Sequence, residues 1–469
     1  MKKRDKKFEL ERIKLVERFE TNPSNCYFDV EEFVSIIEYY IEYFDIESAE
    51  KALQMAFYIH PNNSELLLKQ SEINFQKGEF RISLQCLEKY PNPNDSEMLF
   101  WKAKSLVELG EINYACEYFN RIAENEKDDE YFDDLCFDIA RAFHDEQYAE
   151  ISIHWLKKGY EFNKKNTHLI NYYAMQCALV GKYAESTKFL NESLDLDPYQ
   201  APIWVHLCEN LLKEGKHNDA LKAIDFAVLL DKNNFIAWKI KGELLCDTKD
   251  FDGAIKCFSK AKECAASLEE TSECFFLLAD CFEQKGDYDN ALSCYQENIH
   301  WNKILGVTDS ASLLGCAYSL LGLEKFEEAL TLCEEIGNVF PEIAEGWFYK
   351  GEAFYALNRI DEAEDCYLKA LEMEKNQESR LSIFISLGNI YFGKDEFDKA
   401  LINYNQAYQL KQDDDNIKLL ISITSYKLND KNKAFSLLKE ALKNKEDAIQ
   451  FFTNFCPESE DEIDLLLNK

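Results

Sequence analysis

A pattern of five positions recurs along this chain of 469 residues at intervals close to 34 residues. In residues 346–375 a tryptophan precedes a glycine by four residues, and alanines follow that glycine after twelve and nineteen residues. Residues 235–268 carry the same kinds of residue at the same spacing. The two sets are Trp347, Gly351, Ala363, Tyr367 and Ala370, and Trp238, Gly242, Ala254, Phe258 and Ala261. A repeat of this length is typical of a chain built from stacked copies of one small unit.

The first alanine of the pattern marks twelve units along the chain. Nine of the twelve positions hold Ala and two hold Ser, and five of the eleven intervals between them are 34 residues. The positions are Ala49, Ser83, Ala115, Ile151, Ser186, Ala220, Ala254, Ala291, Ala329, Ala363, Ala400 and Ala434. The units near 64–95 and 132–166 fit the pattern least well, so their register is open by one or two residues.

Packing explains why small residues recur at these positions. A small residue lets a neighbouring helix approach closely, and a large residue one turn away fills the space beside it. We therefore expect two amphipathic helices per unit, with Gly or Asn in the turn between them. Pro61, Pro198 and Pro341 fall between units, where a helix has to end. Insertions near 262–271, 302–309 and 376–380 predict longer helices or an altered superhelical pitch at those joints.

This arrangement resembles the tetratricopeptide repeat family, a right-handed superhelix of stacked helical hairpins, over about residues 30–448. The resemblance implies an all-α fold, a right-handed superhelical α-solenoid of about twelve helical hairpins. We expect residues 1–29 to form an N-terminal capping helix, and residues 449–469 to form a C-terminal cap with an acidic tail. The ends of a solenoid need polar outer faces, which favours capping over the alternative that the tail docks onto another protein.

The charge of the chain restricts its partners. There are 53 Lys+Arg against 87 Asp+Glu, a formal net charge of −34. Such a field repels phosphate backbones and anionic lipid, so we expect no nucleic acid and no membrane as a partner. We found neither an apolar leader nor an apolar run long enough to span a bilayer. The 16 cysteines lack CxxC pairs or a disulfide framework, which favours reduced thiols and a cytoplasmic location.

The sequence carries no motif of a known kind of catalysis. It has no GxGxxG, P-loop, GxSxG or HExxH motif. His206 and Cys208 lie close together, but Cys208 occupies the small-residue position of its helix and suits a buried packing role. We therefore expect no enzyme, no catalytic residue, no cofactor and no metal. An enzyme hidden in a repeat fold stays as an alternative, and it would require convergent polar groups inside the groove.

An acidic residue directly follows the small-residue position of the first helix in six of the twelve units. These residues are Glu38, Glu72, Glu209, Glu243, Asp280 and Glu352. With 87 acidic residues in 469, about two would be expected by chance. Apolar residues three or four positions away, such as Val205 and Phe276, lie on the same helical stripe.

In the resembled family this stripe lines the concave groove where peptides bind. The resemblance therefore implies a protein–protein interaction scaffold that holds an extended, basic or amphipathic segment. The candidate contact residues are Glu209, Glu243, Asp280, Glu352, Val205 and Phe276. A family site for a C-terminal carboxylate is disfavoured, because Lys239 and Asn171 stand alone at the equivalent stripe positions.

Three alternatives stay open at this point. The acidic residues can instead form a solvated face of a strongly acidic protein. The chain can be a regulatory or sensing subunit whose solenoid changes curvature when a peptide binds. Self-association through a repeat at one end is the third alternative.

Overall fold

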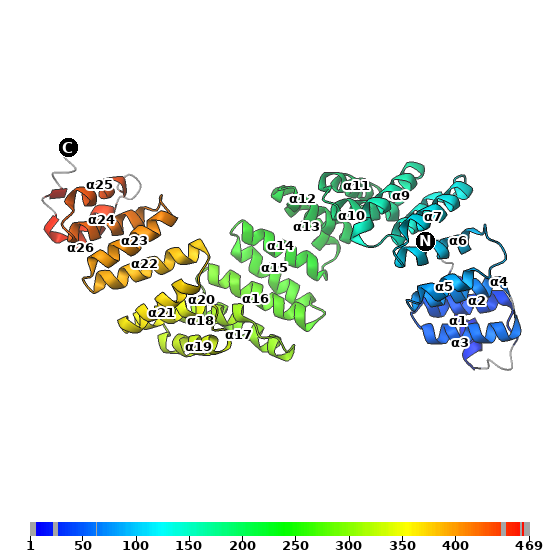
Figure 1. The fold of residues 1–469 in the computed structure, drawn as a ribbon, viewed down its shortest axis with the longest axis horizontal. Helices are drawn as coiled ribbons and strands as arrows, with labels where there is room; N and C mark the ends of the chain where they lie inside the picture. The colour runs from blue at the N-terminus through cyan, green and yellow to red at the C-terminus, as the bar shows by residue number, and fades with distance from the viewer. Residues whose placement is uncertain (1–5, 22–26, 62, 442–446, 460–461, 464–469) are drawn as a thin grey trace. The chain divides into compact units, whose positions relative to one another are not determined.

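The chain is helical throughout the part that the structure describes. The computed structural model describes residues 6–21, 27–61, 63–441, 447–459 and 462–463. These residues form 26 α-helices and two short 3₁₀ helices, Glu146–Tyr148 and Pro457–Ser459, and no strand. The helices belong to two compact units, residues 1–230 and residues 231–469, and each unit is described by itself (Figure 1).

In the first unit, helix α1 precedes six helix pairs. The helices are α1 Lys6–Thr21, α2 Val30–Glu42, α3 Ile46–Ile59, α4 Ser64–Gln76, α5 Phe80–Leu87, α6 Ser96–Glu108, α7 Ile112–Glu126, α8 Phe132–Ala142, α9 Ala149–Phe162, α10 Thr167–Leu179, α11 Tyr183–Leu196, α12 Ala201–Lys213 and α13 His217–Leu230.

In the second unit, six helix pairs precede helix α26. The helices are α14 Phe235–Asp247, α15 Phe251–Cys264, α16 Leu268–Gln284, α17 Tyr288–Ile304, α18 Ser310–Gly322, α19 Phe326–Val339, α20 Ala344–Ala356, α21 Ile360–Met373, α22 Gln377–Gly393, α23 Phe397–Leu410, α24 Asp415–Lys427, α25 Lys431–Ala441 and α26 Ala448–Phe455. The prediction of an all-α solenoid of about twelve hairpins is confirmed.

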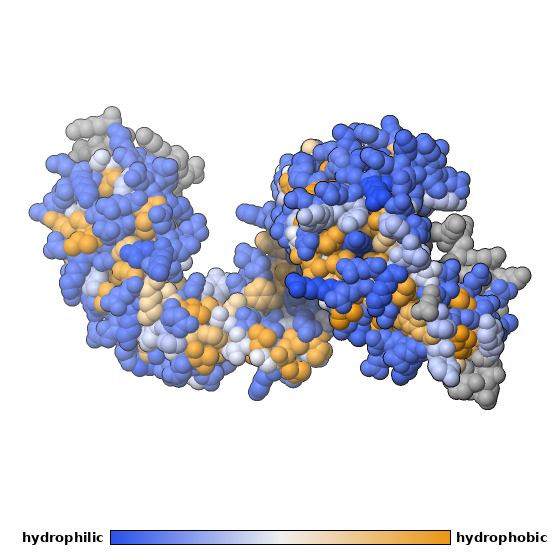
Figure 2. Space-filling view, turned by 45° about the vertical axis from the view of Figure 1, so that its right-hand side comes forward, coloured by the Kyte–Doolittle hydropathy of each residue, from blue (hydrophilic) through white to orange (hydrophobic). Residues whose placement is uncertain are grey.

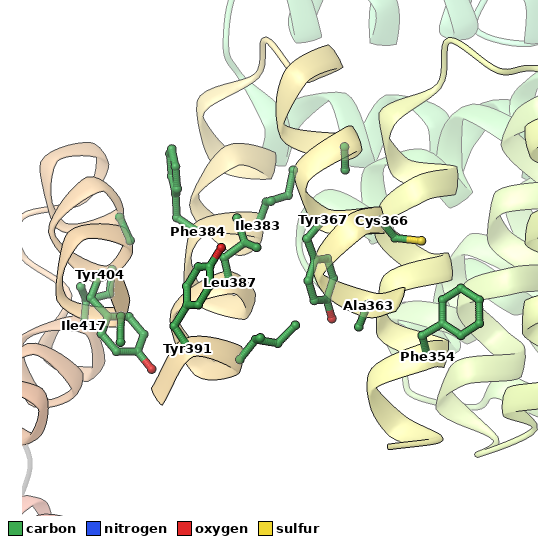
Figure 3. Packing of buried hydrophobic residues seen from close by; sticks show 14 of the residues in the cluster. Phe354, Ala363, Cys366, Tyr367, Ile383, Phe384, Leu387, Tyr391, Tyr404 and Ile417 are labelled. Carbon is green, nitrogen blue, oxygen red and sulfur yellow. The ribbon is translucent and has the colours of Figure 1, made fainter. Parts of the chain in front are cut away.

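Each repeat packs one residue of its first helix against a partner twelve positions later in its second helix. The first-helix residues are Ile37, Ser71, Ala103, Ala140, Ala174, Cys208, Gly242, Ala279, Ala317, Gly351, Gly388 and Ser422, and all are buried. Where this residue is glycine, an aromatic ring fills the space: a Cβ on Gly351 would lie 2.6 Å from the ring of Tyr367. Figure 3 shows this ring within the apolar cluster that helices α20 to α24 share.

The fourth repeat corrects one sequence position. Ser152, and not Ile151, takes the alanine position, because Ser152 is fully buried and its Oγ donates to the carbonyl of Ala140 at 3.0 Å. The next repeat makes the same bond, from Ser186 Oγ to the carbonyl of Ala174 at 2.6 Å. The shift arises because a 3₁₀ helix, Glu146–Tyr148, replaces the usual turn before α9.

The tryptophans of the pattern close the joint with the preceding repeat. Their indole Nε1 atoms donate to the backbone carbonyl six residues earlier, before the helix begins. The bonds run from Trp204 to Pro198, from Trp238 to Lys232 and from Trp347 to Pro341, at 2.9, 2.9 and 3.3 Å. The three prolines predicted to lie between units do so, because each falls between a second helix and the next first helix.

The turn inside eleven of the twelve hairpins has one residue in the left-handed conformation. In all eleven this residue lies seven positions after the buried first-helix residue. It is glycine at Gly78, Gly110, Gly181, Gly215 and Gly286, and another residue type at Phe44, Lys249, Glu324, Asn358, Asp395 and Asn429. Its N–H and the next one bond back to the end of the first helix, as in a Schellman cap.

The longer helices and the end helices follow the sequence expectations to different degrees. Helices α16, α17 and α22 have 17 residues each, which confirms the prediction of longer helices at the insertions. Helix α1 packs on α2 through Val16 and Phe19, and α26 packs on α24 and α25 through Phe452. The domain boundaries at residues 29 and 449 stay a prediction, and much of the predicted acidic tail lies outside the described residues.

Candidate functional site: the face formed by the first helices

The first helices of successive repeats approach one another more closely than the second helices do. In the first unit α2 contacts α4, α4 contacts α6, and α10 contacts both α8 and α12. In the second unit α16 contacts α18, and α18 contacts α20. No two successive second helices of the described part make comparable contact. At these places the first helices therefore line the inner side of the stack. We call the surface that they present in each unit the first-helix face.

Two of the predicted contact residues lie in α12 of the first unit. Glu209 is exposed on the first-helix face, and the ring Nδ1 of His206 lies 3.1 Å from its Oε2. Val205 is only 6% exposed. A ligand on this face would therefore contact Glu209 but not the side chain of Val205.

Two more lie on neighbouring first helices of the second unit, Glu243 on α14 and Asp280 on α16. Both carboxylates are exposed on the first-helix face. Phe276, one turn before Asp280, is half-buried and packs edge-on against Tyr295, with ring centroids 6.0 Å apart. Only part of the Phe276 ring therefore remains available to a ligand.

Acidic groups crowd together around Glu243. Although solvent reaches Glu243, the surrounding protein partly buries its carboxylate, and this partial burial raises its pKa. The carboxylates of Glu273 and Asp247 raise the pKa further, against the opposing effect of Lys239. The ammonium group of Lys239 is itself bound to Glu273 at 3.0 Å. Two helices along, burial also raises the pKa of Glu283. This part of the face holds more negative charge than its own cations neutralise.

Glu352, the sixth candidate, is held by its neighbours. The hydroxyl of Tyr367 donates to Glu352 Oε1 at 2.5 Å, and the hydroxyl of Ser386 donates to the same oxygen at 3.0 Å. Ser386 belongs to α22, the first helix of the next repeat. This carboxylate therefore joins two repeats, and its bonds within the fold explain an acidic residue here without a ligand.

Sequence reasoning missed a charged network on the first-helix face of the first unit. The ammonium group of Lys69 lies 2.8 Å from Glu38, 3.0 Å from Glu72 and 3.9 Å from Glu97, which come from three successive first helices. Burial alone would lower the pKa of Lys69, but Glu72 and Glu38 outweigh it and raise the pKa. The recurrence of Glu38 and Glu72 was visible in the sequence, and their shared cation was not.

A second cation in the first unit lies against aromatic rings. The ammonium group of Lys104 is 4.5 Å from the ring centroid of Trp101 and 4.7 Å from that of Phe75. Burial lowers the pKa of this lysine. Nearby, burial raises the pKa of Asp138, against the opposing charge of Arg141. The face of the first unit is therefore of mixed charge, unlike the crowded acidic region around Glu243.

The first-helix face of the second unit ends in an apolar pocket of about 430 Å³. It is lined by Tyr355, Asn389, Phe392, Gly393, Tyr404, Leu420, Ile423, Thr424, Phe451 and Phe455. Two of these phenylalanines belong to α26, which the sequence indicated only as a cap. The surface in Figure 2 is mainly hydrophilic, with hydrophobic residues gathered in separate patches.

Cys208, the cysteine that the sequence places close to His206, occupies a packing position in the structure. Cys208 is fully buried, and burial raises its pKa to about 12, which disfavours a thiolate. Among the described residues no three His, Cys, Asp or Glu side chains are grouped so that they could hold a metal ion. In the same part of the chain no helix is long and apolar enough to cross a membrane.

Comparison with known proteins identifies the repeat. The tetratricopeptide repeat pattern matches residues 97–128, 233–297, 344–377 and 381–414, which correspond to helices α6–α7, α14–α17, α20–α21 and α22–α23. A TPR repeat-containing protein, MJ1428 of Methanocaldococcus jannaschii, is 23% identical over 424 residues, which are 85% of this chain and 71% of that protein. The chain is a tetratricopeptide repeat protein.

Two further proteins are similar to this tetratricopeptide repeat protein. The DnaJ protein P58IPK homolog A of Oryza sativa is 28% identical over 217 residues, which are 45% of this chain and 43% of that protein. A crystal structure of the APC/C hetero-tetramer Cut9-Hcn1 is 14% identical, with a TM-score of 0.45, and covers 96% of this chain and 93% of the solved chain.

Proposed function

We propose that this protein is an interaction scaffold that binds an extended, basic or amphipathic segment of another protein on its first-helix faces. Tetratricopeptide repeat proteins serve as protein-interaction scaffolds. The partner and the binding surface are the new parts of the proposal. Its principal surface is the acidic region of the second unit around Glu243 and Asp280, and Glu209 is a further contact in the first unit.

The observation that carries the proposal is the crowding of carboxylates around Glu243. Because burial and neighbouring acids raise its pKa, the charged carboxylate is poorly compensated in the free protein. A lysine or arginine from a partner would supply the missing positive charge. The half-buried ring of Phe276, four residues before Asp280, would meet an apolar side chain of the same segment. This combination favours an amphipathic basic segment over a purely polar one.

Two candidates become less suitable under this proposal. Glu352 is bound by Tyr367 and Ser386, and Val205 is buried, so we assign both to repeat packing. The role proposed here is non-enzymatic and cytoplasmic, without nucleic acid, membrane or cofactor. Self-association and a change of curvature on peptide binding are compatible with it, and no contact singles out either of them.

The test is a selection from a displayed library of random peptides against the purified full-length protein. The same library is selected against a Glu243→Lys, Asp280→Lys variant. A control variant carries Glu297→Lys and Glu335→Lys, which change the net charge equally but lie exposed on second helices α17 and α19. Far-ultraviolet circular dichroism verifies that all three proteins have the same helix content.

We expect the wild type and the control variant to enrich the same Lys- or Arg-containing sequences with interspersed apolar residues. The Glu243→Lys, Asp280→Lys variant should lose them. If both charge-reversed variants lose these peptides equally, binding depends on net charge alone, and the assignment to the first-helix face is wrong. If acidic or uncharged peptides are enriched, the proposed chemistry of the partner is wrong.

A further inference from the structure

Two cysteines of the second unit bring their sulfur atoms together across two repeats. The Sγ atoms of Cys246 and Cys281 lie 3.1 Å apart, although 35 residues separate them in the chain. Cys246 lies in the last turn of α14 and is partly exposed, whereas Cys281 lies in α16 and is 1% exposed. Both belong to one apolar cluster with Phe258 and Leu278, and both are free thiols.

We propose that Cys246 and Cys281 are a redox-active pair that forms a reversible disulfide between consecutive first helices. The oxidant is a low-molecular-weight disulfide such as oxidised glutathione. A disulfide requires the two sulfurs to approach to about 2.05 Å, so the pair has only about 1 Å to close. This inference does not depend on the proposed binding function.

The reaction takes place in two exchange steps. First the Cys246 thiolate attacks one sulfur of the oxidant, the S–S bond of the oxidant breaks, and one small thiolate leaves. Then the sulfur of Cys281 attacks the Cys246 sulfur, the mixed disulfide breaks, and the departing small thiolate takes the proton of Cys281 and leaves as a thiol. Two protein thiols and one small disulfide thus become one protein disulfide and two small thiols. Two electrons pass to the oxidant.

The exposure of the two sulfurs fixes their roles. Only Cys246 reaches solvent, so it is the attacking cysteine, and the buried Cys281 is the resolving one. Burial raises the pKa of Cys246, and Asp280, Asp247 and Glu243 raise it further, against the opposing effect of the hydrogen bond with Cys281. Because the thiolate is the nucleophile, the reaction should be slow at neutral pH and faster in alkaline solution.

The position of the pair gives the disulfide a structural consequence. Cys246 follows Glu243 by three residues, and Cys281 directly follows Asp280. A bond between them would fix α14 to α16 beside the acidic part of the first-helix face. Oxidation would therefore restrict movement between two consecutive repeats at that place.

The experiment treats the reduced full-length protein with oxidised glutathione at pH 7 and pH 9, followed by alkylation and peptide mass spectrometry without reduction. Three single variants are compared with the wild type: Cys246→Ser, Cys281→Ser and Cys264→Ser. Cys264 is the matched control, because it is partly exposed in the same unit, and its Sγ lies 3.5 Å from the carbonyl of Lys232. Circular dichroism verifies the fold of each variant.

We expect a linked Cys246–Cys281 peptide and the loss of two of the 16 thiols, faster at pH 9 than at pH 7. Dithiothreitol should restore both thiols. The Cys281→Ser variant should stop at a glutathione adduct on Cys246, and the Cys246→Ser variant should leave Cys281 unmodified. The Cys264→Ser variant should form the link like the wild type. A glutathione adduct that persists on Cys246 in the wild type, or oxidation elsewhere while this pair stays reduced, would overturn the proposal.

Discussion

The hydroxyl of Tyr367 donates a hydrogen bond of 2.5 Å to Glu352, across the two helices of one repeat. Tyr367 is 1% exposed, and its ring occupies the space left by Gly351. This acidic residue of the first-helix face therefore contributes to the packing of the two helices. This role in packing accounts for Glu352 without a ligand.

Replacing Glu352 by alanine should destabilise the second unit. The change leaves the buried hydroxyl of Tyr367 without its acceptor, which costs about 1–3 kcal/mol. Glu352→Gln should cost less, because an amide oxygen still accepts the bond. Urea unfolding followed by circular dichroism measures both, with Glu297→Ala as an exposed control that should change the free energy of unfolding by less than about 0.5 kcal/mol. A loss for Glu352→Ala no larger than that of the control would contradict this role.

Substitutions at the left-handed turn residues should change the stability of the protein through the backbone conformation alone. Glu324 has a φ of 59° and Gly286 a φ of 73°, at the same position of consecutive repeats. Glycine adopts this conformation more easily than other residues by about 1 kcal/mol. Glu324→Gly should therefore be more stable than Glu324→Ala by about that amount, and Gly286→Ala should be less stable than the wild type. A Cβ at Gly286 meets no atom within 4 Å, so a steric clash does not explain the loss. The account fails if alanine and glycine are equally stable at residue 324.

Lys69 should be one of the charges that matter most for the stability of the first unit. Lys69→Met leaves Glu72, whose side chain is only 14% exposed, without its cation. Removing one partner of an ion pair costs several kcal/mol when both partners are buried. In the Lys69 network solvent reaches Glu38, so we expect a smaller loss of stability, of about 2 kcal/mol. The matched control is Lys222→Met, because Lys222 pairs with Asp219 at 2.8 Å with both side chains largely exposed. Thermal unfolding should show a clear loss for Lys69→Met and almost none for the control, and equal losses would refute the network.

Glu243→Gln should stabilise the protein at neutral pH. The folded-state pKa of Glu243 is raised above its ordinary value of 4.5, so folding disfavours the charged carboxylate. This penalty is fully present above the raised pKa, and it disappears as the pH falls through that pKa towards 4.5. The melting temperature of Glu243→Gln should therefore exceed that of the wild type at pH 7, and the two should converge near pH 4. A difference that is constant with pH would exclude titration of Glu243 as its cause.

The repeat fold could be predicted from the sequence because each repeat contacts only its neighbours. Local spacing, such as Trp347 to Gly351 to Ala363, therefore contains most of the packing information. The register failed only near Ile151, where a short 3₁₀ helix replaces the usual turn. The repeating pattern of the sequence does not indicate where a 3₁₀ helix replaces the usual turn.

The candidate binding face could be predicted only in outline. The sequence showed which residues share a stripe, but not which of them are already bound within the fold. Glu352 is held by a hydroxyl fifteen residues away and by another in the next repeat, and Val205 is buried. The apolar pocket of the second unit depends on α26, which lies beyond the repeating pattern. Contacts between repeats determine which side chains are bound within the fold and where the pocket forms. The residue spacing inside one repeat does not predict these contacts.

The most direct test of the central claim is a fluorescence anisotropy titration of one selected basic peptide with the full-length protein. The account predicts that Kd rises at least tenfold in the Glu243→Lys, Asp280→Lys variant and less than twofold in the Glu297→Lys, Glu335→Lys control. It also predicts weaker binding to the wild type as the salt concentration increases, because the contact is between opposite charges. Equal Kd values for the two variants, or an affinity independent of salt, would contradict the claim that this acidic first-helix face binds the partner.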